Sequence, residues 1–174
     1  ICIDDKINNP SLSKQFTKSH YWINIKANLI LYFSGRQLNF MKKILVLCTG
    51  NSCRSQILEG WLKALSNGDY LTFSAGVEAH SINKDAVYYM NEVDIDLSNH
   101  TSDLIEKYCD VKFDLFVTVC DSAKESCPIV PNSVKVLHRN IDDPSKAQDK
   151  PTAFRRARLE LKKLAEKIDV LIRN

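Results

Sequence analysis

A cysteine and an arginine stand six positions apart in the segment Cys48-Thr-Gly-Asn-Ser-Cys-Arg54. A short apolar run, residues 43–47, precedes this segment, and apolar residues recur at helical spacing over residues 55–65 after it. A loop between a strand and a helix can direct its backbone N–H groups at an anion, and the start of the helix adds partial positive charge. The pattern therefore predicts an oxyanion-binding loop that contains a thiol.

The thiol of Cys48 is a candidate nucleophile. Gly50 and Asn51 tolerate the left-handed backbone angles of a tight loop, and Arg54 can donate two hydrogen bonds to a tetrahedral oxyanion. This positive charge should also favour the thiolate of Cys48. The alternative is a phosphate-binding loop with an incidental buried cysteine. The position of Cys48 at the carboxyl end of the expected strand, where open α/β sheets bind their ligands, favours the nucleophile.

Two further cysteines are expected near the same edge. Residues 114–119 form an apolar run, typical of a strand covered on both faces, and Cys120 follows it. We expect the polar segment DSAKES, residues 121–126, to be a loop that can bend Cys127 back onto Cys120. Thiolates attack disulfide sulfurs, so three cysteines within reach could pass oxidation outward from a buried site. The alternative is that Cys120 only fills the core.

A pair of aspartates precedes a proline after the fourth expected strand, in the sequence Asp142-Asp143-Pro144. A reaction that expels an oxygen leaving group needs a proton donor. An aspartate near a thiolate and a second carboxylate could have a pKa raised enough for that role. The alternative is a solvated acidic turn, because Asp-Pro is an ordinary turn signal.

Strands and helices alternate along the chain from Met41. Strands are expected at 43–47, 70–74, 114–119 and 134–137, and helices at 55–65, 84–93, 102–107 (capped by Thr101) and from residue 152. In the last helix an apolar stripe comprises Phe154, Ala157, Leu161, Leu164, Ile168 and Leu171. This order predicts one α/β domain, a three-layer sandwich with a four-stranded parallel sheet flanked by helices.

The first forty residues differ from the rest. They hold five Lys or Arg against two Asp or Glu, whereas residues 41–174 hold nineteen of each. We expect residues 1–40 to be a disordered extension or translated sequence upstream of a start at Met41, and residues 41–174 to be the functional domain. The neutral domain offers no basic face for nucleic acid. Residues 25–33 are too short to span a membrane and lack a signal-peptide cleavage pattern.

The chain has six cysteines, at positions 2, 48, 53, 109, 120 and 127. They include no C-x2-C pair, and the four histidines lie far apart, which argues against a zinc site. With no secretory signal, reduced or catalytic thiols in the cytoplasm are expected rather than a disulfide framework.

The sequence Cys-x5-Arg-Ser after a strand resembles the phosphate loop of the low-molecular-weight protein tyrosine phosphatases. CTGNSCRSQ followed by EGW, together with VTVCDSAKESCPIVP, is similar to the thioredoxin-coupled arsenate reductases of that family. The resemblance covers residues 41–174. It implies that a phosphate-like anion, arsenate, is bound by Thr49, Gly50, Asn51, Ser52, Cys53, Arg54 and Ser55. We also expect Ser55 to donate a hydrogen bond to the Cys48 sulfur.

The resemblance also implies a reaction sequence. Cys48 would attack arsenic while Asp143 protonates the departing oxygen, and Cys120 would then attack Cys48 and release arsenite. Cys127 would attack Cys120, which leaves a Cys120–Cys127 disulfide for thioredoxin to reduce. No organic cofactor is required, and we expect a monomer. In some family members a potassium ion near the loop is held by residues that match Asn51, Glu59, Ser74 and Asp103.

Two alternative functions stay open. The first is a phosphatase of the same fold that cleaves a phosphomonoester through a phosphocysteine. Typical tyrosine phosphatases carry a tyrosine after Asp-Pro, but this chain has Ser145, which weakens the case for a phosphotyrosine pocket. The second alternative is a non-catalytic module that binds an oxyanion or senses redox state.

Overall fold

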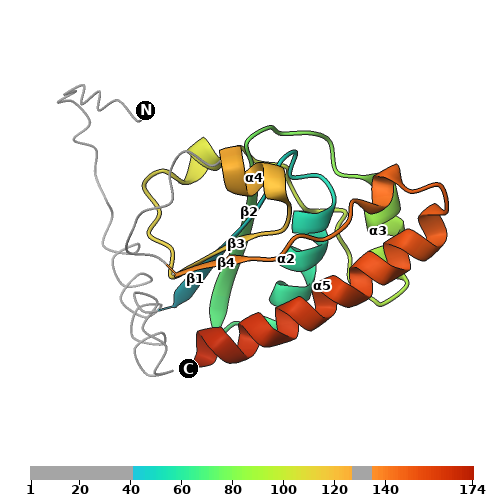
Figure 1. Ribbon diagram of the computed structural model, residues 1–174. Helices are drawn as coiled ribbons and strands as arrows, with labels where there is room; N and C mark the ends of the chain where they lie inside the picture. Colours follow the sequence, from blue (N-terminus) through green and yellow to red (C-terminus); the bar gives the residue numbers. More distant parts are fainter. Residues whose placement is uncertain (1–40, 127–134) are drawn as a thin grey trace, which may run out of the picture. The chain divides into compact units, whose positions relative to one another are not determined.

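Residues 41–126 and 135–174 are described by the structure, a computed structural model (Figure 1). The expected extension over residues 1–40 and the expected third thiol, Cys127, lie outside these ranges. None of the helices in the described ranges is both long and apolar enough to cross a membrane.

Four parallel strands form the sheet of the described domain. They are β1 (Lys42–Cys48), β2 (Tyr70–Gly76), β3 (Leu115–Thr118) and β4 (Lys135–His138), in the order β2-β1-β3-β4. The expected four-stranded parallel sheet is confirmed. Because the strands are parallel, their carboxyl ends meet at one edge, and β1 brings the loop that follows it to the middle of that edge.

The two faces of β1 are covered by different elements. Ile44, Val46 and Cys48 belong to the cluster packed under α2 (Arg54–Ser66), α3 (Lys84–Asn91) and α5 (Lys150–Arg173). On the other face, Leu45 and Leu47 pack with aromatic residues and with the 3-10 helix η2 (Ile105–Tyr108). Figure 1 shows α2 and α5 lying together on one side of the sheet. The sheet, the helices on one face and the η2 segment on the other form three layers, and together they fix the positions of the strand ends.

The long helix α5 begins at a capped end and buries one stripe. The side chain of Asp149 accepts a hydrogen bond from the backbone N–H of Thr152 at 3.2 Å. The expected stripe is buried through Ile168, but its last member is wrong. Leu171 is 42% exposed, whereas Ile172 is 6% exposed. A step of four residues from Ile168 keeps Ile172 on the buried face, and a step of three carries Leu171 toward its border.

Two expected local structures also differ. Instead of an α-helix at 102–107 capped by Thr101, the chain is extended as far as Leu104, which forms a parallel bridge with Gly76, and only η2 follows. The Thr101 hydroxyl donates to the Asp103 carboxylate at 3.1 Å rather than capping a helix. Pairing with the end of β2 therefore outweighs the local helical pattern.

The segment DSAKES is the helix α4 (Asp121–Ser126), not a loop. Ala123 is buried against the core, and the last residue of β4, His138, and Asn140 after it bond to Asp121. Because the segment is polar, its sequence did not indicate that contacts with distant residues would stabilise a helix there.

Replacing Ile168 by Ala should lower the free energy of unfolding by about 2–5 kcal/mol, because the fully buried side chain leaves a cavity. Replacing the exposed Leu171 by Ala should cost only about 0.5 kcal/mol. Urea denaturation of both variants measures the difference. Equal losses would show that the end of α5 does not pack as described.

Candidate active site

The loop after β1 is held from outside by the segment that follows β2. The carbonyl oxygens of Thr49 and Gly50 accept hydrogen bonds from the backbone N–H groups of Glu78 and His80 at 2.9 and 3.1 Å. The carbonyl of Ser52 likewise accepts from Asn83 at 2.9 Å. Carbonyls engaged on the outer side leave the opposite side of the loop to N–H groups, which is the arrangement that binds an anion.

The buried side chain of Asn51 holds the loop in place. The φ angle of this residue is 42°, and Asn51, rather than Gly50, supplies the left-handed turn. The buried Oδ1 atom accepts hydrogen bonds from Ser55 Oγ at 2.9 Å, Ser74 Oγ at 2.8 Å and Gln56 Nε2 at 3.0 Å. Ser55 was expected to bond the Cys48 sulfur, but its hydroxyl donates to Asn51 instead. Asn51 thereby joins the loop to α2 and β2.

Gly76 allows β2 to pass directly beneath the loop. A Cβ atom at this position would lie 2.3 Å from the carbonyl oxygen of Glu78, 2.6 Å from that of Thr49 and 2.9 Å from the backbone nitrogen of Asn51. All three are backbone atoms and cannot move aside cheaply. Our sequence reasoning missed this functional position, although a glycine at the carboxyl end of a strand beside the anion loop was the available signal.

The sulfurs of Cys48 and Cys120 lie 3.7 Å apart at the strand ends, and both residues are buried. Thr49 Oγ1 lies 3.4 Å from the Cys120 sulfur. The hydrogen bond with Cys48, assisted by Thr49 and by the backbone N–H of Ala123, lowers the pKa of Cys120 to about 5. The same hydrogen bond, together with burial, raises the pKa of Cys48, although Arg54 opposes the shift.

The pair of thiols therefore shares one proton. We expected the loop to favour the thiolate of Cys48, but contact with Cys120 and burial raise the pKa of Cys48, whereas the same contact lowers the pKa of Cys120. The expectation considered the loop alone and did not place a second sulfur within contact of the first. A thiolate next to a thiol can receive its proton, so either sulfur can become the nucleophile.

Arg54 connects the loop to the expected acid. One guanidinium nitrogen donates to the carbonyl of Ile141 at 2.8 Å, and a second donates to Asp143 Oδ2 at 3.1 Å. The buried Nε of Arg54 has no hydrogen-bond partner among the described residues. An orphaned buried donor is costly, so this atom is suited to an anion in the loop.

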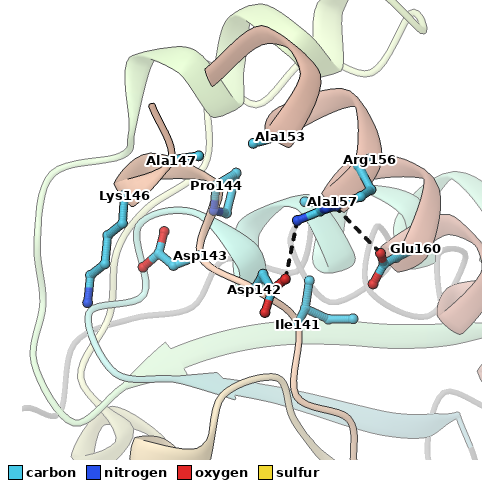
Figure 2. Close-up of a pocket in the computed structure, with 10 residues that line it drawn as sticks. All are labelled: Ile141, Asp142, Asp143, Pro144, Lys146, Ala147, Ala153, Arg156, Ala157 and Glu160. Carbon is cyan, nitrogen blue, oxygen red and sulfur yellow. Dashed lines mark hydrogen bonds and ion pairs between the residues drawn. The ribbon is translucent and has the colours of Figure 1, made fainter. Parts of the chain in front are cut away.

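The two adjacent aspartates face different ways. Ser145 donates its hydroxyl and backbone N–H to Asp143 Oδ1 at 2.6 and 3.0 Å. Asp142 instead pairs with Arg156 at 3.2 Å, on the wall of a cavity of about 240 Å³ (Figure 2). Figure 2 shows the Asp143 carboxylate directed away from that pair. Only Asp143 therefore contacts the arginine of the anion loop.

The pKa of Asp143 differs from our expectation. Burial alone would raise it, but hydrogen bonds from Ser145 and the charge of Arg54 lower the pKa below its ordinary value. The expectation counted a neighbouring thiolate and carboxylate and did not include the ion pair with Arg54. Without an anion in the loop, Asp143 is therefore a carboxylate.

Cys53, inside the loop, is buried, and burial raises its pKa to about 12, with a smaller contribution from the Asp143 carboxylate. It stays protonated near neutral pH. Cys53 therefore has neither the charge nor the exposure of a nucleophile.

Oxygen atoms of the four residues matched to a potassium site converge beside the loop. Ser74 Oγ lies 2.5 Å from Glu59 Oε2, and Asn51 Nδ2 donates to the carbonyl oxygens of Ser74 and Asp103 at 3.2 and 3.3 Å. The Asp103 carboxylate itself bonds elsewhere, to Thr101, Lys107 and Tyr108. Carboxylate and carbonyl oxygens are hard ligands, so this donor set fits an alkali cation.

The model of the low molecular weight phosphotyrosine protein phosphatase family matches residues 43–172. An arsenate reductase of Staphylococcus aureus strain N315 is 48% identical over 126 residues, which cover 72% of this chain and 95% of the relative. The chain belongs to the arsenate reductases of this phosphatase family.

Solved structures agree with this family. A structure described as an arsenate reductase in the phosphate binding state has a TM-score of 0.65 and 30% identity, over 76% of this chain and 99% of that one. A low molecular weight protein tyrosine phosphatase from T. tengcongensis has a TM-score of 0.64 and 26% identity, over 73% and 97% of the two chains. The arsenate reductase and the phosphatase in these two structures thus have the same fold as this chain.

In this arsenate reductase family member, replacing Gly76 by Ala should weaken the binding of inorganic phosphate at least about tenfold, because the added methyl group pushes the loop backbone away. Isothermal titration calorimetry measures the affinity. Gly60 is the matched control, since a Cβ there would meet only side chains of Leu97, Ile95 and Met90. Phosphate affinity that is unchanged in Gly76→Ala would contradict the described packing.

The shared proton predicts the pH dependence of alkylation. Because the pKa of Cys120 is lowered to about 5, its thiolate persists as the pH falls and is lost only near that value. Iodoacetamide should therefore modify the Cys48 and Cys120 pair down to about pH 5, whereas an ordinary cysteine titrates near 8.5. Peptide mass mapping measures modification at each cysteine.

Cys48→Ala removes the hydrogen-bond partner and should move the Cys120 midpoint upward toward the ordinary value. Cys53 is the internal control and should stay unmodified across this range, since its pKa is raised to about 12. A wild-type midpoint near 8.5 would show that the two sulfurs do not share a proton.

Proposed function

We propose that this protein reduces arsenate to arsenite. The observation that carries the proposal is the 3.7 Å contact between Cys48 and Cys120 at the mouth of an oxyanion loop. A phosphatase needs one thiol in that loop and has no chemical use for a second in contact with the first. A reductase that draws electrons from its own thiols needs two that can form a bond.

The first step uses the loop, Arg54 and Asp143. The loop N–H groups and Arg54 bind arsenate as a phosphate-like anion. Cys48 gives its proton to the Cys120 thiolate and attacks arsenic. A sulfur–arsenic bond forms, and one oxygen leaves as water. Asp143 delivers the proton to that oxygen once Arg54 turns from the carboxylate to the anion, because loss of the paired cation raises the proton affinity of Asp143.

The second step reduces the arsenic. Cys120 passes the proton that it accepted in the first step to an oxygen of the arsenic group and, as thiolate, attacks the sulfur of Cys48, so a sulfur–sulfur bond forms as the sulfur–arsenic bond breaks. The electron pair of the broken bond stays on arsenic, which goes from As(V) to As(III) and departs as arsenite. Two thiols have then been oxidised to one disulfide. The two electrons that the thiols lose are the two electrons that arsenic gains.

The later steps extend this proposal to residues outside the described ranges. Cys127 attacks Cys120, which frees the Cys48 thiolate and leaves a Cys120–Cys127 disulfide. Thioredoxin, a dithiol reductant, would reduce that disulfide and restore both thiols. A potassium ion would be held by Glu59, Ser74, Asn51 and the carbonyl of Asp103, and would share the Glu59 carboxylate with Lys63, whose Nζ lies 2.5 Å from Glu59 Oε1.

Phosphomonoester hydrolysis is a second candidate function. Cys48, Arg54 and Asp143 form the set that a cysteine phosphatase uses, and arsenate and phosphate share charge and shape. Ser145 orients Asp143 but provides no aromatic wall for a phosphotyrosine ring. We therefore expect weak hydrolysis of small aryl phosphates beside the reductase activity.

A single turnover without reductant tests the proposal. With one equivalent of arsenate, a Cys127→Ser variant should accumulate a Cys48–Cys120 disulfide and release one arsenite per protein. Cys48→Ser should release none, since no arsenic adduct can form. Disulfide mapping by mass spectrometry and arsenite analysis measure both products.

The matched variant Cys109→Ser should leave the arsenite yield unchanged, because that exposed cysteine lies outside the anion loop. An arsenite yield from Cys48→Ser would remove the assigned nucleophile. Turnover of an aryl phosphate with no arsenite from the wild-type protein would instead favour the phosphatase.

A further inference from the structure

A polar cluster flanks Cys120 at the ends of β3 and β4. Thr118 Oγ1 lies 2.7 Å from His138 Nδ1, and His138 Nε2 lies 2.9 Å from Asp121 Oδ1. The other carboxylate oxygen of Asp121 accepts a hydrogen bond from Asn140 Nδ2 at 2.7 Å. Cys120 stands between Thr118 and Asp121 in the sequence, so the cluster holds the chain on both sides of the second thiol.

The chemistry of the partners assigns their roles. A carboxylate only accepts, so His138 Nε2 donates to Asp121. In the neutral ring, Nδ1 then accepts from the Thr118 hydroxyl. Threonine, histidine and aspartate in this order could suggest a nucleophile triad, but Thr118 is 2% exposed and its hydroxyl cannot meet a substrate. The cluster is therefore a support rather than a second reactive centre.

The cluster fixes the point where β3 becomes α4. Asp121 is the first residue of α4 and follows Cys120 directly. Asp121 receives one bond from the last residue of β4 and one from Asn140, two residues farther on. On the opposite side, the Cys120 sulfur contacts Thr49 Oγ1 and Cys48. The backbone that carries Cys120 is thus held against the anion loop.

We propose that His138 and Asn140, acting through Asp121, are positioning residues for the attack of Cys120 on Cys48. This inference rests on the proposed function. In that step the sulfurs, 3.7 Å apart at rest, must close to a bond of about 2.05 Å as the sulfur–arsenic bond breaks. A displacement of about 1 Å can cost about 100-fold in rate, so a loosened backbone should slow this step.

The test separates sulfur transfer from anion binding. In a Cys127→Ser background, where the disulfide accumulates, Asp121→Ala and His138→Ala should lower the rate of Cys48–Cys120 disulfide formation after one equivalent of arsenate about 10- to 100-fold. The dissociation constant for inorganic phosphate should stay within about twofold, because Asn51 and Arg54 do not depend on the cluster. Rapid acid quench with disulfide mapping gives the rate, and calorimetry gives the affinity.

Two further variants keep the result interpretable. Glu92→Ala is the matched control, since Glu92 also accepts bonds from two side chains, Arg155 and Arg158, but lies at the end of α3. It should change neither quantity. His138→Gln keeps a donor toward Asp121 and should recover much of the rate lost in His138→Ala.

Equal losses of phosphate affinity and disulfide rate would assign the cluster a general structural role and overturn the proposal. An unchanged disulfide rate in both alanine variants would also overturn it. If an alanine variant of Asp121 or His138 fails to fold, Asn140→Ala decides, because it removes only the second bond to Asp121. A wild-type disulfide rate in that variant would overturn the proposal. Absence of any Cys48–Cys120 disulfide from the Cys127→Ser protein would instead refute the proposed function.

Discussion

The buried amide of Asn51 is the interaction on which the rest of the site depends. Its oxygen accepts bonds from Ser55 and Gln56 of α2 and from Ser74 of β2, and its nitrogen donates to the carbonyls of Ser74 and Asp103. One side chain thus joins the loop, the helix and the neighbouring strand. With these bonds made inside and the carbonyls of the loop bonded outside, the loop keeps its shape without a ligand.

Two negatively charged groups lie beside this loop. One belongs to the proton-sharing pair Cys48 and Cys120, and the other to Asp143 beside Arg54. A cysteine phosphatase needs a thiolate, an arginine and an acid, and all three are present. The second thiol is what changes the available chemistry, because a thiol–thiolate contact can become a bond while the departing group keeps the electrons.

The sequence predicts much of this fold because the signals are local. The apolar runs before Cys48 and Cys120 indicate buried parallel strands, and the spacing of Cys48 and Arg54 indicates an anion loop. Local patterns could not show contacts between distant segments. The helix at Asp121 depends on His138 and Asn140, the extended chain at Leu104 depends on Gly76, and the pKa of Asp143 depends on Arg54. Each of these features is decided by a residue in another element.

The position of Arg54 has a consequence for the order of events in the site. While the loop holds no anion, the positively charged guanidinium pairs with Asp143 and stabilises its carboxylate. Asp143 then has no proton to give. An incoming dianion competes for the same cation, and the carboxyl that loses it gains affinity for a proton. In the proposed reaction, anion binding and protonation of Asp143 are thereby coupled, whereas a water molecule in the loop leaves Asp143 ionised.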